Sequence, residues 1–85
     1  MDRTEILEQF GRRVRMLRKE KGFTQEGFAI ACDLDRAYVG SIERGQRNVS
    51  LLTQHILAST LEVSIAHLME GIGNEEIRKG TEDSV

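Results

Sequence analysis

The sequence contains no proline and no tryptophan, and only one cysteine and one tyrosine occur among its 85 residues. The single Cys32 excludes a disulfide within the chain and a zinc site built from several cysteines. No run rich in Val, Ile and Thr alternates with polar residues, so a β-sheet is not expected. No apolar run approaches the roughly 20 residues that a membrane span requires, and charged residues stand near the N-terminus where a signal peptide would be apolar. We therefore expect a cytoplasmic protein with no membrane partner.

Charge is unevenly distributed along the chain, whose net charge is −2. Residues 1–50 contain 10 Lys and Arg against 8 Asp and Glu, whereas residues 51–85 contain 2 against 6. The first part is therefore the candidate for binding a polyanion such as nucleic acid. A solvated helix face gives similar counts, so charge alone leaves both interpretations open.

Apolar residues recur at helical spacing from Ile6 to Met69, which predicts an all-α protein. Small polar residues precede the helical segments and glycines follow several of them, as expected at helix caps. The expected helices span 4–21, 25–32, 36–44, 51–61 and a short segment after position 64, with N-caps at Thr4, Thr24, Asp35, Ser50 and Ser64. We expect a compact five-helix domain over residues 4–72 and a flexible acidic tail over residues 73–85.

The segment Gln25–Arg44 has the pattern of a twenty-residue helix-turn-helix. Ala29 takes the fifth position, where the two helices approach so closely that only a small side chain fits. The apolar positions four, ten, fifteen and eighteen are filled by Phe28, Leu34, Val39 and Ile42. Asp33 stands where the motif usually has a left-handed glycine, a conformation that Asp tolerates better than most residues. The agreement of all these positions in one register predicts the motif more strongly than any single residue does.

Two segments resemble the XRE-type family of Cro and phage repressors: Phe23-Thr24-Gln25-Glu26 and Ser41-Ile42-Glu43-Arg44-Gly45. The resemblance covers roughly residues 6–71. Within the family, the segments 35–39 and 43–51 are most similar to the controller proteins of restriction-modification systems. The resemblance implies a lambda-repressor-like fold and a homodimer that binds palindromic operator DNA. It also implies that the protein regulates its own gene and the endonuclease gene, and that it contacts the transcription machinery at promoters that it activates.

Ala37 and Gly40 depart from the residues that controller proteins tend to have, which leaves the operator sequence open. Two other functions also stay open. One is a general phage-type repressor or an antitoxin-like regulator whose acidic tail docks a protein. The other is a protein-interaction module that has kept the fold without binding DNA.

The second helix of such a motif lies in the major groove with its N-terminal half toward the base edges. We therefore predict that bases are contacted by Arg36, Ala37, Tyr38 and Ser41. Arg36 can donate two parallel hydrogen bonds to guanine, and the methyl group of Ala37 can contact a thymine methyl. A solvated or salt-bridged role for Arg36 and simple packing for Tyr38 remain the alternatives.

The start of the first motif helix, at Thr24 and Gln25, offers backbone amides to a phosphate. The resemblance implies that the Gln25 side chain fixes the recognition helix or the DNA backbone. It implies phosphate contacts from the loop residues Arg44, Gln46, Arg47 and Asn48. It also implies a structural ion pair between Arg18 and Glu43. A polar surface loop is the alternative for residues 44–48.

Apolar residues are concentrated near the end of the domain at Ile65, Leu68, Met69 and Ile72, which suggests a dimer interface; closure of the monomer core is the alternative. Both histidines, His55 and His67, lack neighbours that would make a metal or catalytic site, so we expect structural roles for them. No carboxylate pair or glycine-rich phosphate loop is present. We therefore expect no catalytic residue, metal or cofactor.

Overall fold

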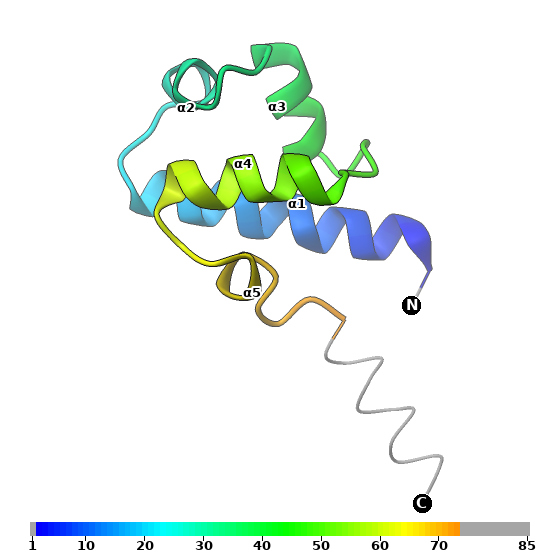
Figure 1. Cartoon of the computed structure of the whole chain (residues 1–85). Helices are drawn as coiled ribbons and strands as arrows, with labels where there is room; N and C mark the ends of the chain where they lie inside the picture. Colours follow the sequence, from blue (N-terminus) through cyan, green and yellow to red (C-terminus); the bar gives the residue numbers. More distant parts are fainter. Residues whose placement is uncertain (1, 74–85) are drawn as a thin grey trace, which may run out of the picture.

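The computed structural model describes residues 2–73, so the predicted tail lies outside the described residues except for Gly73. Every regular element in this range is a helix (Figure 1). The helices are α1 (Arg3–Glu20), α2 (Gln25–Cys32), α3 (Arg36–Glu43), α4 (Leu51–Leu61) and α5 (Ile65–Leu68). The prediction of an all-α, five-helix architecture is confirmed. None of these helices is long and apolar enough to cross a membrane.

The helices are arranged around the pair α1 and α4, which lie side by side in the middle of the molecule (Figure 1). The pair α2 and α3 packs above them, and α5 packs below. All five helices contribute to one hydrophobic core. The most deeply buried large side chains are Val14, Phe28, Val39, Ile42, Leu57 and Leu68. The helix-turn-helix is therefore anchored in the same core as the rest of the domain.

Two glycines set the distance between α1 and the end of α3. A Cβ atom on Gly11 would lie 2.5 Å from the carbonyl oxygens of both Ile42 and Glu43. Gly45 has a left-handed φ of +76°, and a Cβ atom there would lie 2.8 Å from the Cα atom of Glu8. Since no side chain fits at either place, α3 rests almost directly on the backbone of α1.

Three of the predicted N-caps accept the expected hydrogen bonds, namely Thr24 from Gly27 N, Ser50 from Thr53 N and Ser64 from His67 N. The prediction for α1 was wrong by two residues. Its N-cap is Asp2, whose carboxylate accepts from the Glu5 backbone N–H at 2.9 Å. A carboxylate at this position also interacts favourably with the helix dipole, which explains why the helix begins before Thr4.

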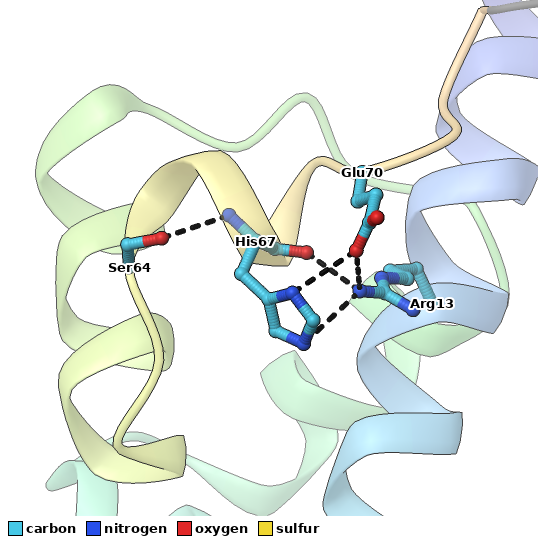
Figure 2. A network of polar contacts seen from close by, with 4 residues as sticks. All are labelled: Arg13, Ser64, His67 and Glu70. Carbon is cyan, nitrogen blue, oxygen red and sulfur yellow. Dashed lines mark hydrogen bonds and ion pairs between the residues drawn. The ribbon is translucent and has the colours of Figure 1, made fainter.

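Polar contacts of Arg13 hold α5 against α1 (Figure 2). Its Nη2 atom donates to the carbonyl oxygen of His67 at 2.7 Å and to Oε2 of Glu70 at 3.3 Å. The Nδ1 atom of His67 lies 3.0 Å from the same carboxylate oxygen. His67 therefore belongs to a structural contact between helices, and no group of three or more metal-ligating side chains occurs among residues 2–73.

Leu68 is fully buried within the monomer, which corrects its predicted place in a dimer interface. It points into the core from α5, where the chain itself already covers the whole side chain. Ile65, Met69 and Ile72 are partly buried and pack against the same core. By contrast, Leu51 and Leu52 on the first turn of α4 are 69% and 70% exposed.

Candidate nucleic-acid interface

The helices α2 and α3 are joined by a tight turn that begins at Asp33. This residue adopts a left-handed conformation, with φ 57° and ψ 43°, as the helix-turn-helix pattern predicts. The backbone N–H groups of Asp33 and Leu34 donate to the carbonyl oxygens of Ile30 and Ala29, at 3.0 and 2.9 Å. Ala29 is buried and packs in the same core as α3. The turn therefore directs α3 across α2 in a fixed orientation.

The N-terminal end of α3 is exposed to solvent. Arg36 and Ala37 are exposed, and Tyr38 is partly buried. Asp35 occupies the N-cap position with an extended backbone, but its side chain makes no capping hydrogen bond, contrary to its predicted role. The guanidinium of Arg36 and the methyl group of Ala37 therefore lie on the exposed N-terminal edge of α3, which is called the open edge below.

Ser41 does not belong to this open edge. Its side chain is buried, with 6% of the residue exposed, and its hydroxyl donates to the Tyr38 carbonyl oxygen at 2.7 Å. The same hydroxyl accepts from Nε of Arg47 at 3.1 Å. The guanidinium of Arg47 also lies 5.9 Å from the centre of the Tyr38 ring, a cation–π distance. Because its hydroxyl is already used, Ser41 positions Arg47 and Tyr38 rather than presenting itself to a base.

A buried ion pair fixes the other end of α3. Arg18 of α1 donates from Nε to Oε2 of Glu43 at 2.6 Å and from Nη2 to Oε1 at 3.0 Å. Gln25, the first residue of α2, donates to Oε1 of the same carboxylate at 3.3 Å. The side chains of Arg18 and Glu43 are only 8% and 4% exposed. The pair implied by the resemblance is thus present in the structure, and it ties α1, α2 and α3 together.

The loop between α3 and α4 carries exposed polar groups beside the open edge. Arg44, Gln46, Arg47 and Asn48 are all exposed. Arg44 donates from Nε to the side-chain oxygen of Gln46 at 3.3 Å. Sequence reasoning did not find the contacts of Ser41 and Tyr38 with Arg47, because they join residues in different elements.

The face formed by α3 and this loop is positively charged. Within residues 2–73, the ion pairs of Arg and Lys are Arg13–Glu70, Arg18–Glu43 and Lys21–Glu62. Arg36, Arg44 and Arg47 take part in none of them. With Glu43 paired to Arg18, the three arginines outnumber the exposed carboxylate of Asp35, so the charge at this face favours an anion.

Comparison with known proteins agrees with this geometry. Residues 9–70 match the model of the helix-turn-helix domain family. The control protein C.MunI of a Mycoplasma species is 42% identical over 72 residues, which are 84% of this chain and 97% of that protein. The control protein C.BamHI of Bacillus amyloliquefaciens is also 42% identical, over 82% of this chain and 90% of its own.

Solved structures give the same result in three dimensions. The restriction-modification controller protein C.AhdI from Aeromonas hydrophila superposes with a TM-score of 0.71 at 50% identity, covering 73% of this chain and 94% of that one. The wild-type controller protein C.Esp1396I has a TM-score of 0.73 at 33% identity, with 85% and 95% covered. The chain therefore belongs to the helix-turn-helix family of transcription regulators, in the group of restriction-modification controller proteins.

Proposed function

We propose that the protein binds palindromic operator DNA as a homodimer and places α3 of each subunit in the major groove. The observation that carries this proposal is the open edge of α3, where Arg36 and Ala37 are exposed while the helix itself is fixed by the buried contact of Arg18 with Glu43. A rigid helix with an accessible arginine at its N-terminal end has the geometry that direct contact with guanine requires.

Phosphate contacts are proposed on both sides of this edge. On one side, Arg44, Gln46, Arg47 and Asn48 extend from the loop. On the other, Thr24 caps α2 and Gln25 begins it, and the N-terminal end of this helix is proposed to approach a phosphate. Phosphate contacts do not distinguish one base sequence from another, but they position α3 on the DNA and make the affinity dependent on salt.

Two protomers are proposed to meet through α5 and the start of α4. Met69 and Gln54 line one hollow between these helices and α1. Leu51 lies one turn before Gln54 on the same side of α4, and its side chain is largely exposed. A second copy covering Leu51, Leu52, Ile65, Met69 and Ile72 would bury this apolar surface. A symmetric dimer of this kind spaces its recognition helices by about 34 Å, one turn of DNA.

The biological role follows from the group to which the chain belongs. We propose that residues 4–72 form the DNA-binding and dimerisation domain, and that the protein acts in the cytoplasm on the promoters of its own gene and of an endonuclease gene. Contact with the transcription machinery is proposed for promoters that it activates. A phage-type repressor is the second candidate, because the immunity repressor of Bacillus phage phi105 is 33% identical over 69 residues, although these are only 46% of that protein.

The test is a selection of binding duplexes from a random-sequence DNA pool, followed by titration of the variants Arg36→Ala and Arg47→Ala. The wild type should enrich a palindromic site. Arg36→Ala should lose discrimination at one base pair of each half-site, worth about 1–3 kcal/mol, while Arg47→Ala weakens all duplexes alike. Failure to enrich any duplex would favour a protein-interaction module, and an unchanged base preference of Arg36→Ala would refute the assignment of this residue.

A further inference from the structure

A groove continues from the open edge of α3 past the helix-turn-helix toward α1. It consists of two adjoining hollows of about 330 and 310 Å³ that share Gln25, Gly40 and Arg44. The first hollow reaches Arg36 and Ala37, which are proposed to contact bases. The second hollow reaches Arg15, an exposed residue of α1. The groove therefore connects the base-contacting edge with a residue outside the motif.

Gly40 keeps the floor of this groove open. A Cβ atom on Gly40 would lie 3.0 Å from Nη1 of Arg44 and 3.4 Å from Oε1 of Gln25. Any larger side chain would project into the space between these two groups. The glycine, which weakens a helix by about 1 kcal/mol relative to alanine, thus leaves room beside an arginine.

The groups that face the second hollow favour an anion. Arg15 and Arg44 line it, and neither takes part in an ion pair within the part of the chain that the structure describes. Glu43 also lines it, but both of its carboxylate oxygens accept hydrogen bonds from Arg18. Two cationic side chains are therefore available at the mouth of a hollow whose one carboxylate is already neutralised.

We propose that this second hollow holds a phosphate of the DNA backbone, with Arg15 and Arg44 as its two cationic ligands. The inference rests on the proposed function, because the hollow adjoins the one lined by Arg36 and Ala37, so a strand whose bases contact Arg36 can continue along the groove. A free anion is a weaker fit, since the hollow is open and continuous with the base-contacting edge. Arg15 thereby extends the interface onto α1 and contributes to affinity without selecting bases.

The experiment compares Arg15→Gln with Arg12→Gln, an exposed arginine of the same helix that lines neither hollow. Affinity is measured against salt concentration for the duplex selected by the wild type and for a scrambled duplex of equal length. Because the dimer carries two such residues, Arg15→Gln should reduce the slope of log K against log salt by about 1.8, about 0.9 for each subunit, and the affinity by about tenfold per subunit at 0.1 M salt, equally on both duplexes. Arg12→Gln should retain most of the wild-type slope. Circular dichroism checks that both variants are folded.

A second measurement identifies the phosphate. Each phosphate of the selected duplex is replaced in turn by an uncharged methylphosphonate. At one position per half-site, the substitution should weaken the wild type and Arg12→Gln but have little further effect on Arg15→Gln. The inference is overturned if both variants lose affinity equally, or if Arg15→Gln is as sensitive as the wild type at every position. If the wild type binds no duplex specifically, the proposed function fails first, which separates the two outcomes.

Discussion

The carboxylate of Glu43 accepts two hydrogen bonds from the guanidinium of Arg18, at 2.6 and 3.0 Å, in a site where both side chains are almost completely buried. Removal of one partner leaves the other charge buried without compensation. We therefore expect Glu43→Gln to lower the free energy of unfolding by about 3–5 kcal/mol. The matched control is the double variant Arg18→Met, Glu43→Leu, which should recover much of the loss. Urea denaturation measures both, and a double variant less stable than the single one would contradict this account.

The close packing of α1 against the end of α3 leaves no room for a side chain at Gly11. A methyl group there would meet the carbonyl oxygens of Ile42 and Glu43, which are backbone atoms and cannot move aside independently. Gly11→Ala should therefore destabilise the fold by about 1–3 kcal/mol or more, despite the better helix propensity of alanine. The measurement is the denaturation midpoint.

The control for Gly11 is Gly40→Ala, whose new methyl group meets only the ends of flexible side chains. This variant should be as stable as the wild type or more stable by up to about 1 kcal/mol. Its affinity for DNA should nevertheless fall, because the methyl group narrows the groove beside Arg44. Equal destabilisation by both substitutions would show that the close approach of α1 and α3 is not the cause.

Much of the fold was predictable because its determinants are local. Cap residues and apolar spacing define α2, α4 and α5 closely, and the small residue Ala29 marks the approach of the motif helices. Gly11 was not recognisable, because its role depends on which helix crosses α1 at that point. The exposure of Leu51 and Leu52 was not predictable either, because helical spacing does not show which neighbour covers a residue.

The candidate site was predictable in part for the same reason. Exposure of Arg36 and Ala37 follows from their position at the start of the recognition helix. The contact of Ser41 with Arg47 depends on the course of the next loop, and the place of Arg15 depends on the packing of α1 beside α3. Neither relationship leaves a signal in sequence spacing.

The left-handed turn at Asp33 provides a prediction about strain. A non-glycine residue in this conformation is strained by about 1–2 kcal/mol. Glycine removes this strain but loses more conformational entropy on folding, which offsets part of the gain. Asp33→Gly should therefore raise the free energy of unfolding by up to about 1 kcal/mol. Asp35→Gly, at a residue with φ −67°, should bring no such gain. Thermal denaturation compares them, and a gain at both positions would rule out relief of strain.

Cys32 gives a prediction about pH. Burial raises the pKa of its thiol above the ordinary value of 9.0, and the hydrogen bond with Thr60 offsets this only in part. As the pH rises, the thiol of the unfolded chain therefore loses its proton first. The stability that this group contributes is complete below the unfolded pKa and is lost as the pH rises from about 9 toward the folded pKa, with a slope of at most about 1.4 kcal/mol per pH unit.

The control for this effect is Cys32→Ala, which cannot ionise. The difference in unfolding free energy between the wild type and Cys32→Ala should be constant from pH 6 to 8 and should shift against the wild type above about pH 9. Subtracting the two curves removes the titration of Lys and Tyr. A difference that stays constant up to pH 11 would refute the role of burial at this thiol.

The exposed leucines on α4 lead to the last prediction. Leu52 is 70% exposed and lies on the proposed dimer surface, whereas Ile30 on α2 is 73% exposed and lies elsewhere. Replacing either with Glu removes a similar apolar area, and neither change disturbs the core. Leu52→Glu should shift the monomer–dimer equilibrium in sedimentation toward monomer. It should also weaken binding to a two-half-site duplex far more than to a single half-site, because only the former requires two linked recognition helices. Ile30→Glu should leave dimerisation unchanged, so equal dissociation of the two variants would argue against an interface at the start of α4.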